Sequence, residues 1–323
     1  MAHLFRSLAF VMGATVVLAG RPVLADETPA GGRSAVKPAT PNKFIRIRRD
    51  STGQPTALVT AVVRFASKSG EGGVVVDLVS AVHVADRAYY EKLNERLDQY
   101  DVVLYELVAP EGTRIPKGGR RNSDNPIAFL QQLATLVLDL DLQTEQIDYT
   151  RKHFVHADLS PEQMAEAIRN RGDDGVTLFL SIASDLLRQQ NRQELKKGKG
   201  AQATEPEVDL LSMVLDPDGA AKLKRLMAEQ MEALESPDGG IGATLSTILI
   251  ADRNKAAMKV LGRELAKGKK KIAIFFGAAH MPDFEKRLSE DLGLTRQREE
   301  WIQAWDMRGK KRSLLDLLKM LDQ

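Results

Sequence analysis

Two short apolar segments, each followed by a histidine and then an amphipathic stretch, constrain this chain most. Residues 73–79 and 271–276 are almost continuously apolar, which is typical of strands buried on both faces of a parallel sheet. His83 follows the first segment and His280 follows the second, each three residues before an aspartate. This similarity indicates a degenerate internal repeat. It predicts two strand–turn–helix units far apart in the sequence.

Both units are expected to continue into a further strand. Residues 101–107 form another buried-type segment, and a helix behind an Asp86 N-cap is predicted between it and the first strand. The apolar residues that recur there at helical spacing are Tyr89, Tyr90, Leu93 and Leu97. In the second unit, a helix carrying Phe284 and Leu288 leads to a Gly293 turn and a possible strand at 300–305. The pattern predicts two βαβ-type units.

The rest of the chain adds a hairpin and helices. Residues 44–48 and 57–65 read as strands joined by a turn at 50–53. Residues 125–267 are mostly helical by period, with a capping box from Ser160 to Gln163. The predicted fold class is therefore α/β (α+β), with a mixed, mainly parallel sheet and a helical insertion at about 125–245. We expect one domain over 44–323.

The N-terminus has the features of an export signal. Arg6 precedes an apolar stretch at 8–19, and small residues near 23–25 suit cleavage. The stretch is shorter than a membrane span. We therefore expect a signal peptide at 1–25, a flexible leader at 26–43, no stable membrane span after signal removal, and a periplasmic or secreted protein.

Charge and cysteine content exclude several classes of function. Removing residues 1–25 takes away Arg6 and Arg21 and lowers the formal net charge from +2 to zero, which argues against nucleic acid as the main partner. The chain has no cysteine. Disulfides, thiolate metal sites and cysteine nucleophiles are thus excluded, and any metal ion must bind nitrogen and oxygen ligands.

Three ligand-type residues follow or end the predicted strands. Open α/β sheets place ligands at the carboxyl edge of their strands, so His83, Glu106 and His280 are expected to face one crevice. Two imidazoles and a carboxylate can hold a divalent ion such as Mn, Co or Zn with one open position. The alternatives are that each histidine is a turn or capping residue, and that Glu106 forms a buried salt bridge with an arginine.

Further candidates lie outside this set. Arg253, on a predicted helix at 248–254, could clamp a carboxylate bidentately or be a solvated charge on the helix face. Residues 151–158 are rich in groups that titrate or bind metals. His156 and Asp158 are taken from this segment as additional site candidates, and His153 lies beside them. The spacing of the two histidines suits a helix, whereas Asp158 before Ser160 suggests a loop.

Four segments, in this order, resemble the TraB/PrgY/GumN (Tiki-like) family, within the erythromycin-esterase/ChaN-like group. That family's pattern is a G-x-x-H turn, a glutamate after the next strand, an R-N pair in a helix and a second G-x-x-H turn. The matching segments are 80–83, 104–107, 251–254 and 277–280. Ser80 replaces the first glycine, and Met281, Pro282 and Asp283 replace the Leu-x-Gly that often follows the second histidine.

The resemblance implies paired βαβ units and, as in the animal members, metal-dependent proteolysis by two histidines and a glutamate. We therefore expect a peptidase-like hydrolase of peptide or protein substrates. Its site residues would be His83, Glu106, Arg253 and His280, with Asn254 as an additional candidate. The alternative is a non-catalytic haem- or peptide-binding regulatory protein that uses the same crevice. Haem would need a His or Tyr ligand, for which Tyr89 and Tyr90 are candidates. A third possibility is that these residues serve packing alone.

Overall fold

The computed structural model describes residues 44–67, 73–110, 140–170, 218–234 and 250–309, with a few isolated positions between them. The predicted signal peptide and leader lie outside the described residues, as does much of the predicted helical insertion. No helix in the described ranges is long and apolar enough to cross a bilayer.

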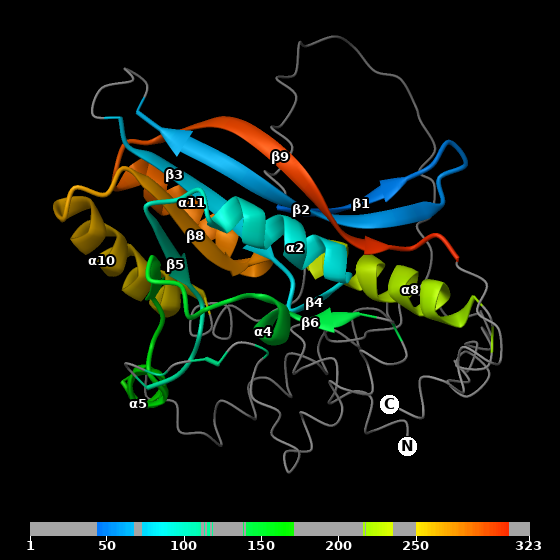
Figure 1. Cartoon of the computed structure of the whole chain (residues 1–323), viewed down its shortest axis with the longest axis horizontal. Helices are drawn as coiled ribbons and strands as arrows, with labels where there is room; N and C mark the ends of the chain where they lie inside the picture. Colours follow the sequence, from blue (N-terminus) through cyan, green and yellow to red (C-terminus); the bar gives the residue numbers. More distant parts are fainter. Residues whose placement is uncertain are drawn as a thin grey trace, which may run out of the picture.

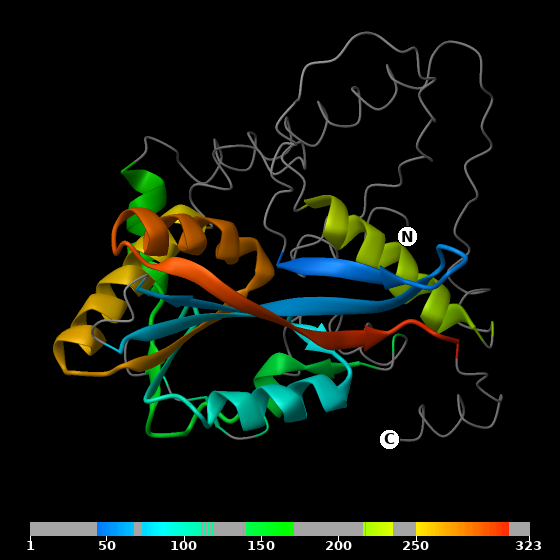
Figure 2. The same ribbon diagram turned by 90° about the horizontal axis from the view of Figure 1, so that it is seen from above.

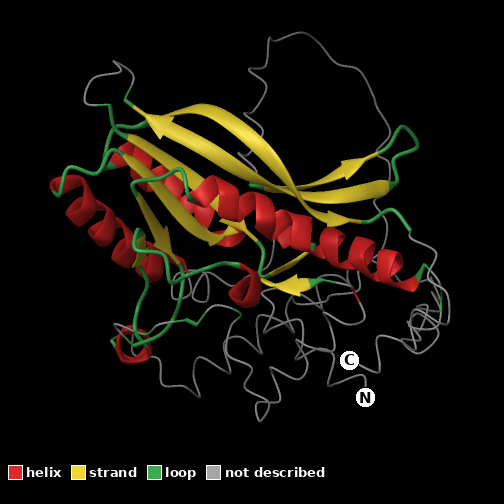
Figure 3. Ribbon diagram, in the orientation of Figure 1, coloured by secondary structure: helices red, strands yellow, loops and turns green. Residues whose placement is uncertain are grey.

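The described chain forms one seven-stranded sheet with helices packed against it (Figure 1, Figure 3). Its strands are β1 (Ile45–Arg49), β2 (Pro55–Ala66), β3 (Val75–Ala81), β5 (Val102–Tyr105), β7 (Phe154–His156), β8 (Lys271–Gly277) and β9 (Thr295–Asp306). The spatial order is β9, β2, β3, β8, β5, β7, and β1 lies beside β2 in line with β3. Strand β2 runs antiparallel to its partners, whereas β3, β8, β5 and β7 are parallel. The predicted mixed, mainly parallel sheet is confirmed.

The predicted hairpin is present as β1 and β2. Asp50 Oδ1 accepts hydrogen bonds from the backbone N–H groups of Thr52 and Gln54 at 2.9 and 3.0 Å. Gly53 has a φ of 83°, a conformation that glycine adopts without steric cost. Together these residues form a tight turn that sets the register of the two strands.

Helices cover both faces of the sheet (Figure 2). They are α2 (Arg87–Leu97), α4 (Gln143–Gln146), α5 (Pro161–Arg169), α8 (Gly219–Leu234), α10 (Asp252–Ala266) and α11 (Met281–Glu290). Tyr89, Tyr90, Leu93 and Leu97 of α2 are buried in one core cluster, as their spacing predicts. Phe284 and Leu288 of α11 are buried in a second cluster together with α10. The helices of the two similar units thus belong to different core clusters.

The structure corrects three details of the prediction. Strand β8 lies between β3 and β5, so the first βαβ unit is split by a strand from the far end of the chain. Strand β7 lies within the predicted helical insertion and extends the sheet. Asp86 makes no side-chain cap to α2, because its carboxylate binds Lys224 Nζ at 3.0 Å and the Asp306 N–H at 2.5 Å.

Other local predictions are confirmed. Ser160 and Gln163 bond reciprocally, each side chain to the other's backbone N–H, at 3.1 and 2.9 Å, and α5 begins there. Gly293 has a φ of 63°, and the Leu294 N–H bonds back to the Leu288 carbonyl at 3.0 Å. This contact closes the end of α11 in the manner of a left-handed C-terminal cap. The following strand, β9, begins five residues before the predicted position.

Candidate functional site

Four parallel strands end at a common edge of the sheet. Ala81 at the end of β3 pairs with Gly277 at the end of β8, and Tyr105 at the end of β5 pairs with Phe275 and His156. Because strand register fixes where each chain leaves the sheet, the residues after these strands emerge close together. They are His83 after β3, Glu106 after β5, Asp158 after β7 and His280 after β8.

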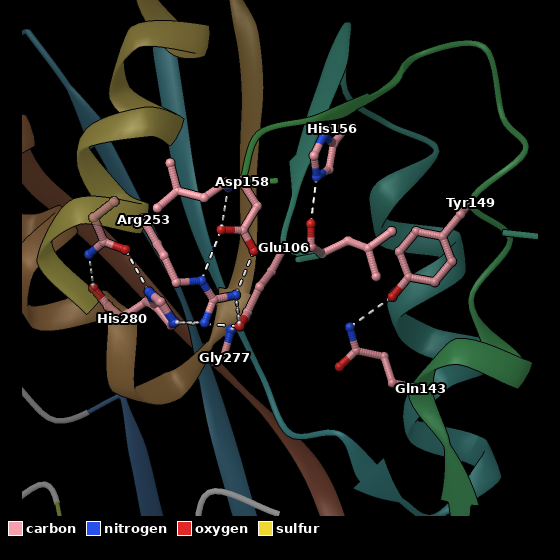
Figure 4. A network of polar contacts seen from close by, with 11 residues as sticks. Glu106, Gln143, Tyr149, His156, Asp158, Arg253, Gly277 and His280 are labelled. Carbon is pink, nitrogen blue, oxygen red and sulfur yellow. Dashed lines mark hydrogen bonds and ion pairs between the residues drawn. The ribbon is translucent and has the colours of Figure 1, made fainter. Parts of the chain in front are cut away.

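Arg253 is the hub of the polar cluster at this edge (Figure 4). Its Nε and Nη2 donate to the two oxygens of Asp158 at 2.9 and 2.5 Å, which is a bidentate pair. Its Nη2 also donates to Glu106 Oε1 at 2.6 Å, and its Nη1 lies 3.4 Å from His280 Nε2. Arg253 comes from the first turn of α10, which packs on the sheet through Ala257 and Leu261. The guanidinium is therefore a buried clamp rather than a solvated charge.

Glu106 is ionised in this environment. Burial alone would raise the pKa of its carboxyl, but the charges of His280, Arg253 and His83 together hold that pKa well below its usual value. The Gly277 N–H donates to Oε2 at 2.7 Å, so both carboxylate oxygens have partners. The salt bridge to an arginine that the apolar sequence around Glu106 suggested is thus present, and it is shared with Asp158.

His280 has a fixed ring orientation. The Nδ2 of Asn254 donates to the His280 carbonyl and to Asp283 Oδ2, both at 2.9 Å. Because both partners are acceptors, Asn254 must present Oδ1 to the imidazole, and His280 Nδ1–H donates to it at 2.6 Å. The Nε2 atom is thereby directed toward Glu106 Oε1, 3.5 Å away. Ligating histidines in metal sites are oriented by second partners in the same way.

His83 also lies close to Gly277. A Cβ built on Gly277 would lie 3.3 Å from Glu106 Oε2, 3.9 Å from His280 Cδ2 and 3.9 Å from His83 Nε2. The bare Cα of Gly277 therefore lies in a small space bounded by the two predicted histidines and the predicted glutamate. We call this space the Gly277 cradle. His83 is exposed, whereas His280 is buried, so the cradle has one solvent-facing wall.

The ionised side chains of the cluster do not cancel in charge. Glu106 and Asp158 contribute two negative charges, and Arg253 contributes one positive charge. The Asp158 side chain is fully buried and the Glu106 side chain is 11% exposed. Because a buried negative charge is costly without a positive partner, a further cation beside these two carboxylates would be favourable.

Not every sequence-predicted residue joins this cluster. His156 lies on β7, where its Nε2–H donates to the Leu107 carbonyl at 2.5 Å, as Figure 4 shows. His153 Nε2–H donates to the Leu97 carbonyl at 3.1 Å. Both histidines thus sit on or beside a strand rather than a helix, and they hold neighbouring backbone in place. Asp158 and Asn254, in contrast, contact Arg253 and His280 directly.

The expectation that Tyr89 or Tyr90 could be a haem ligand is contradicted by their burial. Tyr89 and Tyr90 are both fully buried. The Tyr89 hydroxyl lies 3.1 Å from the Ser80 carbonyl, and the Tyr90 hydroxyl lies 3.1 Å from the Val82 carbonyl. They are core residues that pin the end of β3, so neither is available to a ligand.

The donor side chains at this edge match a metal ion in type but are not yet arranged around one point. In the described ranges, no three His, Asp or Glu side chains are already arranged around one point as a metal site. Arg253 contacts two of the expected donor atoms, Glu106 Oε1 and His280 Nε2, so a metal ion would compete with the guanidinium for them. The donor set nevertheless suits a divalent ion in chemistry, since two imidazoles and a carboxylate lie around Gly277.

Sequence reasoning missed three participants near the site. The Gly277 N–H binds Glu106, and the Gly-x-x-His spacing carries a signal for it, since a glycine before a histidine turn allows close approach. Gln143 Nε2 donates to the Tyr149 hydroxyl at 2.8 Å, and Figure 4 draws this pair apart from the cluster around Arg253. No motif marks these two residues.

Comparisons with family models, curated proteins and solved structures found no match.

Proposed function

We propose that the chain is a metal-dependent, peptidase-like hydrolase of the TraB/PrgY/GumN (Tiki-like) type, exported to the periplasm or secreted. The observation that carries this proposal is the Gly277 cradle, where His83, Glu106 and an oriented His280 surround one glycine. These three residues would hold the ion, and Mn, Co and Zn suit their nitrogen and oxygen donors.

The roles of the protein groups follow from their contacts. A bound divalent ion would supply a water molecule with a pKa near neutrality. Glu106 is kept ionised by its surroundings, so it is ready to act as a ligand. Asn254 keeps the proton of His280 on Nδ1 and leaves Nε2 facing the site. Arg253, held by Asp158, would stabilise the negative charge that develops on an amide carbonyl bound beside it.

The experiment is a metal titration combined with a cleavage assay. Purified protein is titrated with Mn²⁺, Co²⁺ and Zn²⁺ by calorimetry and incubated with a quenched fluorogenic peptide library. His83→Ala, at an exposed position, is expected to lower metal affinity by about a hundredfold and to abolish cleavage. His153→Ala is the control, because the His153 ring contacts the Leu97 carbonyl and the Phe154 ring, neither of which belongs to the cluster around Arg253. Unchanged metal binding and cleavage in His83→Ala would reject the proposal.

A second candidate, a non-catalytic peptide-binding protein, is favoured by one observation. Glu106 and Asp158 are already paired with Arg253, as in a structural ion cluster. Such a protein would bind library peptides without cleaving them, with or without added metal. Retention of peptides without turnover would therefore select this candidate over the hydrolase.

A further inference from the structure

The guanidinium of Arg253 contacts two atoms that a metal ion would need. Its Nη2 donates to Glu106 Oε1 at 2.6 Å, and its Nη1 lies 3.4 Å from His280 Nε2 (Figure 4). The Nη1 contact uses the lone pair of Nε2, because the ring proton is on Nδ1, where Asn254 accepts it. The same lone pair would bind a metal ion. Arg253 therefore takes up one carboxylate oxygen and one imidazole nitrogen of the expected ligand set.

Asp158 holds the same guanidinium from a second direction. Nε and Nη2 of Arg253 donate to Asp158 Oδ1 and Oδ2 at 2.9 and 2.5 Å. The Nε contact involves no atom that also binds Glu106 or His280. A bidentate arginine–carboxylate pair is stronger and more specific in geometry than a single contact. Arg253 can therefore give up Glu106 while it stays bound to Asp158.

The charges at the site favour such a division once a divalent ion binds. In the structure, the carboxylates of Glu106 and Asp158 share the single positive charge of Arg253. An ion bound to Glu106 would leave Arg253 to neutralise Asp158 alone, so each carboxylate would have a cation of its own. Burial makes this pairing important, because the Asp158 side chain is fully buried and an unpaired charge there is costly.

We propose that Arg253 is an internal cation that occupies the donor atoms until a divalent ion displaces it, and that it then withdraws onto Asp158. Asp158 is the positioning residue of this device, because its carboxylate retains the arginine before and after the exchange. The device discriminates against weakly binding cations, since an incoming ion must first displace the guanidinium from Glu106 and His280. The inference rests on the proposed function and adds to it a control of metal loading at the same site.

The first test removes the guanidinium and measures metal affinity. Calorimetric titration with Zn²⁺ and Mn²⁺ compares wild type with Arg253→Gln, whose amide can still donate to Asp158. Affinity is expected to rise by about tenfold to a hundredfold, because the ion no longer breaks a charged hydrogen bond. Peptide cleavage should fall in the same variant, since the positive charge beside the carbonyl is lost.

Arg64→Gln is the matched control for this titration. Arg64, on β2, makes a similar bidentate pair with the buried Asp77, with both contacts at 2.9 Å, and it is not part of the cluster around Arg253. Its loss should leave metal affinity unchanged. Equal or lower affinity in Arg253→Gln than in wild type would overturn the inference.

A double-variant cycle tests the part played by Asp158. Asp158→Asn is expected to lower metal affinity in the wild-type background, because the arginine then binds Glu106 more tightly. In the Arg253→Gln background the same change should have a much smaller effect, since no guanidinium remains to be retained. A loss of equal size in both backgrounds would show that Asp158 acts through its charge alone, and its role as the anchor would be rejected.

A third measurement uses the wild-type protein, so it does not depend on how well the variants fold. A crystal structure with bound Zn²⁺ is expected to show Arg253 still paired with Asp158 and no longer within hydrogen-bond distance of Glu106. A bond between Arg253 and Glu106 that persists beside bound zinc would refute the exchange and leave the hydrolase proposal standing. Tighter zinc binding by Arg253→Gln without any peptide cleavage by wild type would support the exchange and reject the hydrolase. Absence of binding in both proteins would reject both.

Discussion

Replacing Gly277 by alanine tests the candidate site with little disturbance of the fold. Gly277 has φ −56° and ψ 147°, a conformation open to alanine. The added methyl would lie 3.3 Å from Glu106 Oε2 and 3.9 Å from His83 Nε2. The carboxylate must therefore move by a few tenths of an ångström, and the methyl occupies the space between the three expected metal ligands.

The stability and the function of Gly277→Ala are expected to respond differently. Reduced freedom of the unfolded chain favours alanine by about 0.4–1 kcal/mol. The weakened bond from the Gly277 N–H to Glu106 opposes this gain, and a hydrogen bond to a charged group contributes about 1.5–3 kcal/mol when intact. The net change in unfolding free energy should stay within about 1 kcal/mol, a Tm shift below about 4 °C. Metal affinity and peptide cleavage should fall by about tenfold to a hundredfold.

The assay is calorimetric metal titration, with Tm measured on the same samples. Gly262→Ala is the control, because Gly262 lies within α10 and an added Cβ there would meet no atom within 4 Å. This variant should be slightly more stable, since alanine favours helices, and should bind metal normally. If Gly277→Ala keeps full metal affinity and cleavage, the cradle is not the site. A large drop in Tm would show instead that Gly277 serves packing.

Three further predictions concern buried and paired groups. Asp158→Ala removes one partner of a buried ion pair with Arg253 and should lower the free energy of unfolding by about 3–5 kcal/mol, measured by urea denaturation; a change below about 1 kcal/mol would contradict the pairing. Burial is the first cause of the raised pKa values of all five tyrosines. Ultraviolet titration should therefore detect less tyrosinate at pH 10 in the native protein than in the urea-unfolded protein, and stability should fall as the pH rises above that value. Hydrogen bonds from the backbone N–H groups of Lys271 and Lys270 lower the pKa of the Asp101 carboxyl. Asp101→Asn should therefore lower the free energy of unfolding at pH 7, and its difference from wild type should vanish as the pH falls through the lowered pKa. Urea unfolding of both proteins at about pH 7 and pH 2.5 makes the comparison.

Local patterns in the sequence predicted individual helices, caps and strands better than they predicted the order of the strands in the sheet. The apolar spacing of α2 and the capping box of Ser160 depend on residues a few positions apart, so the sequence determines them directly. The insertion of β8 between β3 and β5 depends on which buried strands pair. Several apolar strands satisfy that requirement equally well, so periodicity alone could not select the order.

The same distinction applies to the candidate site. That His83, Glu106 and His280 lie near one another could be predicted, because each follows or ends a predicted strand and strand ends meet at one edge of a parallel sheet. The pairing of Asp158 with Arg253 was not predicted, because it depends on how α10 packs beside the end of β7. Burial and pairing are properties of the assembled fold, and neither residue carries a sign of them in the sequence.

The strand order also makes the site a property of the whole chain. Glu106 follows β5 in the first half, whereas Arg253 and His280 belong to α10 and the turn after β8, 147 and 174 residues later. Because β8 pairs with β3 on one side and β5 on the other, it holds the strand end before His83 and the strand end before Glu106 on its two sides. A chain that ended before residue 250 would lack β8, and these two strands would have no shared partner. His83 and Glu106 would then lose both their common edge and the cation that pairs with the carboxylate, so the site can form only after the sheet is complete.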